Sequence, residues 1–395
     1  MVHPAKRGTL LVLVAGLTFG AIIAPAAAQG LFLNGENASL VLGQRDLTSN
    51  VAAVTRRGEN GPGAVALDNA GDMWVSDQCN SRLLEYKPPF ENHMAASVVL
   101  GEPNFITTSS PQPCFSGTIQ PTNAANILSY NDGFGLDASG DIWVADSGNN
   151  RVLEFVPPFT NGMSPSRVIG QPNFTSSATA TTANGMSFPT DLTFDAVGDL
   201  WVVDAENNRV LEFVPPFTDG MKASLVVGQA NFASSDCVTT RRGFCEPNNI
   251  VFDAGGNLWI LDAFVNNRLL QFQAPFRTGM RASREIGQPN FTSNSPGLGR
   301  SEFNLTDGSG MGIDGDGNIW VADLDNNRML EFPYVNGAIE KHAAIVIGQP
   351  NFESSASATS PGGLSFPVTP AFDMSGNLWA PDSNNNRVLE YKAHP

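Results

Sequence analysis

Histidine is scarce in this 395-residue chain, which contains only four. Once an N-terminal signal segment is set aside, His93, His342 and His394 remain. The first two fall in links between repeated strands, and the third is the penultimate residue. A Ser/His/Asp triad needs a histidine beside its nucleophile as general base. The sequence therefore does not favour triad hydrolysis.

Cysteine is also scarce. The chain has four cysteines, and none of them has the CxxC or CxxH spacing of a zinc site. In an exported protein, four cysteines indicate two disulfides rather than a metal cluster.

Basic residues are outnumbered by acidic ones, 22 to 38, which gives a net charge of −16. Removing residues 1–28 takes away Lys6 and Arg7 and no acid, so the remainder has 20 basic and 38 acidic residues, or −18. Such a chain repels phosphate backbones. We expect no nucleic-acid partner.

Long apolar runs are absent after the N-terminus. The single one, from Thr9 to Ala24, follows Lys6 and Arg7 and precedes Ala26, Ala27 and Ala28. This layout predicts a signal peptide over residues 1–28, cleaved before Gln29. An uncleaved anchor is the alternative, although the run is short for a membrane span. We expect a secreted or periplasmic protein, monomeric and without a membrane span after cleavage.

What the chain does contain is a sixfold repeat. Its six tryptophans lie 58–69 residues apart, each six residues after one Asp and three before another. An Arg follows each second Asp. A regular period of this length is the signature of a repeat architecture. The tryptophans are Trp74, Trp143, Trp201, Trp259, Trp320 and Trp379.

Each repeat has four strand-like segments, such as "DLTFD", "DLWVVD", "RVLEFV" and "SLVVG", with a D-x-x-G-[DN] turn after the first. Six such units predict an all-β fold, a six-bladed β-propeller over residues 29–395. The last unit lacks its fourth strand, whereas "SLVLGQRDL" at 39–47 is a spare copy of one. We expect this N-terminal strand to pair with residues 387–391 and close the ring.

The stretch "FPTDLTFDAVGDLWVVDAENNRVLEF" at 188–213 resembles an NHL repeat, and the likeness extends over all six units. The resemblance implies the propeller fold. The family includes RNA-binding and protein-binding modules as well as lyases, so function must be argued from the site. Its lyases rely on histidine around the top of the channel, and this chain offers none there.

The repeated Asp and Arg, for example Asp323 and Arg328, are expected to be structural, because a catalytic residue is needed once and not six times. The loops between second and third strands share a face, here called the top face, with the long unequal links 106–131, 175–189, 233–247, 292–308 and 353–366. Irregular loops on a rigid scaffold are where binding usually occurs.

The four cysteines fall on this top face. Cys79 lies in a loop between second and third strands, and Cys114 lies in the link that follows the same blade. Cys237 and Cys245 flank one link. We expect the disulfides Cys79–Cys114 and Cys237–Cys245.

The repeats stop agreeing at the start of the innermost strands. Counting four residues back from the first Asp gives Ala64, Gly133, Asp191, Asn249, Gly310 and Thr369. Three adjacent blades carry oxygen-bearing groups here or one residue earlier: Asp132, Asp191, Asn248 and Asn249. Glu59 precedes the first inner strand and is expected to reach the same mouth.

Carboxylate and amide oxygens suit a hard cation, so one hypothesis is a weak calcium site with Asp132, Asp191 and Asn249 as ligands. The alternative is that these groups cap strand ends. The function that the sequence favours is non-catalytic binding of a protein or small-molecule ligand on the top face. The alternative is a metal-dependent hydrolase or lactonase, or a lyase, that uses the channel mouth.

Overall fold

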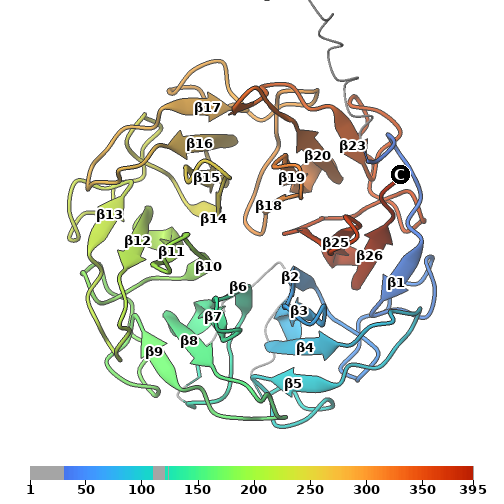
Figure 1. Ribbon diagram of the computed structural model, residues 1–395, viewed down its shortest axis with the longest axis horizontal. Coiled ribbons are helices and arrows are strands. Elements are labelled where there is room, and N and C mark those ends of the chain that lie inside the picture. Colours follow the sequence, from blue (N-terminus) through green and yellow to red (C-terminus); the bar gives the residue numbers. More distant parts are fainter. Residues whose placement is uncertain (1–30, 110–120, 123, 395) are drawn as a thin grey trace, which may run out of the picture. The chain divides into compact units, whose positions relative to one another are not determined.

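Six four-stranded antiparallel sheets make up the part of the chain that this computed structural model describes, residues 31–109, 121–122 and 124–394 (Figure 1). The sheets are the blades of a propeller, and the first strand of each contacts the first strand of its neighbours around a central channel. The predicted all-β, six-bladed fold is therefore confirmed.

Within each blade, the first strand lies nearest the channel and the fourth strand lies at the outer rim. Blade 1 contains β2 (Pro62–Leu67), β3 (Met73–Asp77), β4 (Arg82–Tyr86) and β5 (Val98–Leu100). Blade 2 contains β6 (Asn131–Leu136), β7 (Ile142–Asp146), β8 (Arg151–Phe155) and β9 (Arg167–Ile169). Blade 3 contains β10 (Pro189–Phe194), β11 (Leu200–Asp204), β12 (Arg209–Phe213) and β13 (Leu225–Val227).

Blade 4 follows the same plan, whereas blades 5 and 6 depart slightly from it. Blade 4 contains β14 (Pro247–Phe252), β15 (Leu258–Asp262), β16 (Arg268–Phe272) and β17 (Arg284–Ile286). Blade 5 contains β18 (Met311–Ile313), β19 (Ile319–Asp323), β20 (Arg328–Phe332) and β23 (Ile345–Ile347), with a small hairpin of β21 (Tyr334–Val335) and β22 (Ala338–Ile339) inserted. Blade 6 contains β24 (Ala371–Phe372), β25 (Leu378–Asp382), β26 (Arg387–Tyr391) and β1 (Leu40–Leu42).

The second and third strands form the hidden middle of each blade. In blade 3, β11 and β12 pair in a register that sets Asp204 opposite Arg209 and Trp201 opposite Glu212. Every residue of β11 is buried, because neighbouring blades cover both faces of the sheet. Trp201 packs edge-on against Phe276 of the following blade, with the ring centroids 4.9 Å apart. The repeated tryptophan thus fills the space between blades, as predicted.

The hairpin between the first two strands is fixed by its aspartate. In blade 3, Oδ1 of Asp195 accepts hydrogen bonds from the backbone N–H groups of Val197 and Asp199, both 3.0 Å long. Gly198 has φ of +91°, a conformation that glycine adopts without steric cost. The D-x-x-G pattern is therefore explained by the requirements of the turn.

Five of the six loops between second and third strands contain one turn of 3₁₀ helix. These turns are η1 (Gln78–Asn80), η2 (Ser147–Asn149), η3 (Ala205–Asn207), η4 (Leu324–Asn326) and η5 (Ser383–Asn385). The blade 4 loop carries one extra residue, and no helix is assigned between β15 and β16.

The N-terminal strand completes the last blade. β1 pairs antiparallel with β26, with Leu40 opposite Glu390 and Leu42 opposite Val388. The contribution of this pairing to stability stays a prediction. Within the described residues, no helix has the length and apolar character needed to cross a membrane.

Candidate functional site

The repeated Asp–Arg pair ties each long link to its blade. In blade 3, Nε of Arg209 lies 2.7 Å from Oδ2 of Asp204, and both side chains are fully buried. The same guanidinium donates to the carbonyls of Thr182, Gly185 and Phe232, at 2.8, 3.0 and 2.6 Å. These four hydrogen bonds use four of the five donors of an arginine, whereas a lysine has only three.

The equivalent ion pairs are Arg82–Asp77, Arg151–Asp146, Arg268–Asp262, Arg328–Asp323 and Arg387–Asp382. Burial raises the pKa of each of these aspartates, and the arginine beside it opposes that rise. Six equivalent buried pairs support the predicted structural role.

The residue before each of these arginines joins one blade to the next. Asn150 and Asn208 have left-handed backbones, with φ of 54° and 53°. Their Oδ1 atoms accept the backbone N–H of Phe188 at 2.8 Å and of Glu246 at 2.7 Å, just before the next inner strand. Ser81, Asn327 and Asn386 do the same for Tyr130, Phe366 and Gly61.

Four of the five residues held in this way are bulky and strained. Tyr130, Phe188, Glu246 and Phe366 have φ between 52° and 57°, where non-glycine residues are uncommon and each costs roughly 1 kcal/mol or more. All four stand seven residues before the first Asp of their units, as does Asp307 in blade 5. Strain of this kind concentrates where a side chain must be aimed at something.

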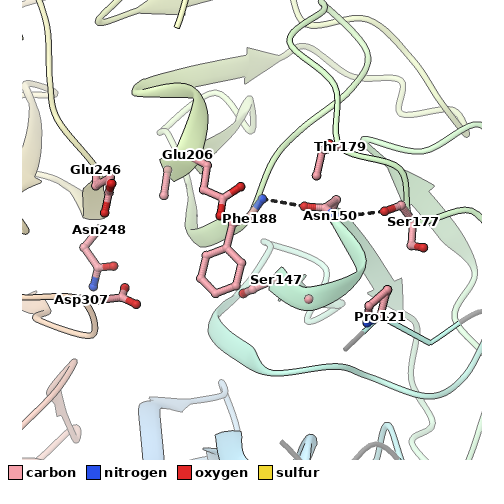
Figure 2. A pocket seen from close by; sticks show the side chains of 12 residues that line it. Pro121, Ser147, Asn150, Ser177, Thr179, Phe188, Glu206, Glu246, Asn248 and Asp307 are labelled. Carbon is pink, nitrogen blue, oxygen red and sulfur yellow. Dashed lines mark hydrogen bonds between the residues drawn. The ribbon is translucent and has the colours of Figure 1, made fainter. Parts of the chain in front are cut away.

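A cavity of about 570 Å³ opens on the top face above blades 2 to 5, and we call it the funnel. Figure 2 shows Glu246, Asn248 and Asp307 on one side of it, with Phe188 and Glu206 facing them. Its lining residues are Pro121, Ser147, Gly148, Asn150, Ser177, Thr179, Phe188, Ala205, Glu206, Glu246, Asn248 and Asp307.

Among the described residues, three carboxylates and no basic side chain line the funnel. Asp307 keeps access to solvent although protein surrounds it on most sides. This enclosure raises its pKa, and the charge of Glu206 raises it further. The pKa of Glu246 is raised by partial burial and by the charges of Asp307 and Glu206. The three acids therefore repel one another across the cavity and favour a positive occupant.

Below the funnel the propeller axis narrows to a space of about 20 Å³, which we call the channel neck. Asn248 lines both spaces, so the neck adjoins the funnel at this side chain. Burial raises the pKa of Asp132 in the neck well above its usual range, and Asp307 adds to this. The neck is lined by Gly63, Gln78, Asp132, Gly133, Thr190, Asn248, Asn249, Gly308, Val368 and Thr369.

Two polar atoms in the neck lack a protein partner. Gln78 Nε2 donates to Oδ1 of Asp132, whereas Oδ2 of Asp132 is buried without a hydrogen bond. The hydroxyl of Thr190, whose residue is 2 % exposed, is likewise unpartnered. Buried polar groups without partners are costly and normally have a reason to persist.

The proposed calcium ligands do not all face the same space. Asp132 and Asn249 line the channel neck, whereas Asp191 is not among the lining residues. Oδ2 of Asp191 accepts the N–H of Ile250 at 3.1 Å, and Oδ1 of Asn249 accepts that of Met311 at 3.2 Å. These bonds satisfy the innermost strand of the next blade.

Burial raises the pKa of Asp191 to about 7. Within residues 31–109, 121–122 and 124–394, no group of three His, Cys, Asp or Glu side chains is arranged to hold a metal ion. The calcium site therefore stays a hypothesis.

Glu59 lies apart from the other predicted residues. It is fully buried and does not line the neck or the funnel. Its carboxyl packs against Gly43, where an added Cβ would come within 2.7 Å of the carboxyl carbon. Burial, followed by the charge of Asp77, raises the pKa of Glu59 to about 8.

The Cys237–Cys245 disulfide is present as predicted, with the Cα atoms 4.3 Å apart. Cys114, the predicted partner of Cys79, lies outside the described residues, and that pair stays a prediction. None of the described histidines lines the funnel or the neck.

Several residues of the funnel escaped prediction. The positions four residues before the first Asp of each unit lie where neighbouring inner strands meet. The positions seven residues before it include Phe188, Glu246 and Asp307, which line the funnel. That column holds two acids and three aromatics among six members, so its departure from small residues was visible in the sequence. Glu206 comes from the variable second place after the repeated Asp.

Comparison with known proteins supports the repeat assignment. The NHL repeat model matches residues 133–155, which correspond to β6, β7 and β8. Peptidyl-glycine alpha-amidating monooxygenase B of Xenopus laevis is 28% identical over 175 residues, which cover 44% of this chain and 18% of that protein. The match thus spans less than a fifth of that relative's length.

Solved propellers have a similar fold at low sequence identity. The PQQ-bound aldose sugar dehydrogenase of Streptomyces coelicolor aligns with a TM-score of 0.51 and 14% identity, covering 87% of this chain and 97% of that one. Virginiamycin B lyase of Staphylococcus aureus aligns with a TM-score of 0.47 and 14% identity, covering 85% and 96%. At such identity the likeness concerns the fold alone. The chain thus contains six equivalent units, one of which matches the NHL repeat model, and together they form a six-bladed β-propeller.

Proposed function

We propose that this protein is an exported binding propeller whose funnel takes up a small molecule or a short segment of a partner protein. The observation that carries the proposal is the funnel itself. Its volume of about 570 Å³ lies within the ~300–1,000 Å³ usual for ligand sites. It is walled by Phe188, Glu246 and Asp307, members of the column where the repeats diverge.

The backbone strain at Phe188 and Glu246 supports the same conclusion. A propeller needs only small residues at this position, as Gly61 in blade 1 illustrates. Retaining a phenyl ring and a carboxylate there costs stability, and a bound ligand offsets that cost. NHL propellers generally mediate protein interactions, so a peptide segment is included among the expected ligands.

The test is a thermal-shift screen of chemically diverse small molecules and peptides against the parent and a blocked variant. Thr179 is exposed and lines the funnel, so the bulky side chain of Thr179→Trp obstructs part of it. Ser357 is the exposed equivalent in the link before blade 6 and lines no part of the funnel, which makes Ser357→Trp the matched control. Ligands should stabilise the parent and Ser357→Trp but not Thr179→Trp. If no compound separates the two variants, the funnel is not a binding site.

Catalysis in the neck is the second candidate, and Asp132 is the residue that favours it. A carboxyl beside a cavity, with its pKa raised well above the usual range by burial, can act as a general acid in hydrolase, lactonase or lyase chemistry. Turnover of a lactone or ester panel that Asp132→Asn abolishes would support this function. Binding without turnover in the parent would leave the non-catalytic proposal.

Export is proposed from the N-terminal sequence and fits the disulfide between Cys237 and Cys245. N-terminal sequencing of protein recovered outside the cytoplasm should begin at Gln29. Recovery of a membrane-bound chain beginning at Met1 would indicate the uncleaved anchor instead.

A further inference from the structure

The charges of the funnel narrow the chemistry of its ligand. Glu206, Glu246 and Asp307 come from three different blades, and the described part of the funnel lining includes no lysine, arginine or histidine to neutralise them. In the described part of the chain these acids do not form a compact three-ligand group for a metal ion. They are spread around a space of about 570 Å³, large enough for an organic molecule, and they attract positive charge to it.

The channel neck adds an independent feature. The hydroxyl of Thr190 and Oδ2 of Asp132 are both buried and without partners, and both residues line the neck. The neck has room for about one water-sized group, at about 20 Å³. An acceptor-rich space of this size suits a primary ammonium, a compact group with three hydrogen-bond donors. A guanidinium is planar, wider, and carries five donors in a fixed fork.

Part of the funnel wall is aromatic. The ring of Phe188 lies beside the ring of Tyr130, with the centroids 6.0 Å apart, and Phe188 faces the acids across the cavity (Figure 2). An aromatic wall accommodates an apolar ligand body and also attracts a cation through its ring face. The funnel therefore joins an apolar surface to an acidic one that leads down to the neck.

We propose that the funnel binds primary amines with an apolar or aromatic body, the ammonium group entering the channel neck toward Asp132, Thr190 and Asn248. This inference rests on the proposed function, since it assigns a ligand class to the same cavity. It covers free amines and lysine side chains of a partner protein, because both present the same primary ammonium.

Calorimetric titration of the full-length secreted protein, in buffer with a chelator, tests the ligand class. The probes are 4-phenylbutylamine, the corresponding guanidine, and the neutral 4-phenylbutanol. The amine should bind at least about tenfold more tightly than either analogue, and its affinity should fall as salt is raised. Equal binding of the alcohol and the amine would overturn the inference. Calcium added without chelator should compete with the amine only if the neck also holds that ion.

Three variants locate the site. Asp307→Asn should weaken amine binding about tenfold, and Thr190→Val, which removes only the unpartnered hydroxyl, should weaken it severalfold. Asp325→Asn is the matched control, because Asp325 is an exposed acid in η4 on the top face that lines neither space. Melting temperatures confirm that each variant is folded.

The outcomes separate the two proposals. If Thr179→Trp abolishes binding of some screened ligand while Asp307→Asn leaves amine affinity unchanged, the funnel is a binding site and the ligand class is wrong. If Thr179→Trp leaves the binding of every ligand unchanged, the proposed function itself fails. Acetylated lysine peptides that bind as well as unmodified ones would also exclude ammonium recognition.

Discussion

The phenolic hydroxyl of Tyr86 donates a 2.9 Å hydrogen bond to Oε1 of Glu59, and both side chains are fully buried in blade 1. The other oxygen of Glu59 has no partner. The equivalent place in other blades is filled by apolar side chains such as Leu128, Met186 and Phe244, each of which packs against the glycine that ends a fourth strand. Glu59 does so against Gly43, which follows β1, and is therefore a polar replacement where the N-terminal strand meets the ring.

This replacement should make stability depend on pH. The pKa of Glu59 is about 8 in the folded protein, against a usual value of 4.5. Because the folded state holds this proton more tightly, stability is full below about pH 4.5 and is lost as pH rises toward 8, by up to ~1.4 kcal/mol per pH unit. Glu59→Met should remove this dependence and raise the free energy of unfolding at pH 8 by about 1–3 kcal/mol. Urea unfolding at pH 5 and pH 8 measures it, with exposed Glu353→Met as control; equal gains at both pH values would contradict the assignment.

Substitution of any of the six buried arginines should lower the stability of the protein by a similar amount. Arg328→Ala and Arg209→Ala each leave a buried aspartate unpaired and release a long link, so each should cost about 3–5 kcal/mol of stability. Arg242→Ala, at an exposed position in the same kind of link, should stay within ~0.5 kcal/mol. Denaturant titration compares the three. A folded, stable Arg328→Ala variant that has lost only function would indicate a chemical role instead.

The Cys237–Cys245 disulfide closes a loop across eight positions of sequence. Replacing both residues by serine should lower the free energy of unfolding by about 2 kcal/mol, the loop-closure value for a short loop. Calorimetry of the double variant measures this loss.

Non-reducing peptide mapping should also find Cys79 joined to Cys114, and a Cys79 linkage to Cys237 or Cys245 would refute the predicted pairing.

Removing residues 31–47 should destabilise the whole propeller. The deletion exposes β26, and it also takes away the Leu47 carbonyl to which the Arg387 guanidinium donates. Thermal unfolding should start at a lower temperature and lose cooperativity. A truncated protein that melts like the parent would show that the N-terminal strand does not close the ring.

Glu246 tests whether a strained backbone conformation is retained because its side chain serves ligand binding. Glu246→Gly should raise stability by about 0.5–1 kcal/mol, because its φ of 53° suits glycine and because a charge facing Asp307 is removed. The same variant should bind amines more weakly. Blade 1 already has a glycine, Gly61, at the equivalent position, which shows that this backbone geometry needs no side chain. A loss of stability in Glu246→Gly would mean that the carboxylate serves the fold.

The sequence by itself determined the architecture. The spacing of tryptophan, aspartate and arginine defines six units, and a residue that serves the fold recurs in every unit because every blade meets the same packing problem. The pairing of Cys237 with Cys245, the structural role of Asp323 and Arg328 and the placement of the N-terminal strand beside residues 387–391 all follow from that periodicity and from chain order.

Only the tertiary structure decided which departures from the repeat face an open space. Asp191 breaks the pattern as clearly as Glu246 and Asp307 do, yet it accepts a backbone N–H of the next blade and lines neither space, whereas Glu246 and Asp307 line the funnel. In a strand, a shift of one residue turns a side chain to the opposite face, and the left-handed residue ahead of each inner strand redirects the chain again. Side-chain direction at these positions depends on backbone angles and on contacts with the adjacent blade, neither of which residue types reveal.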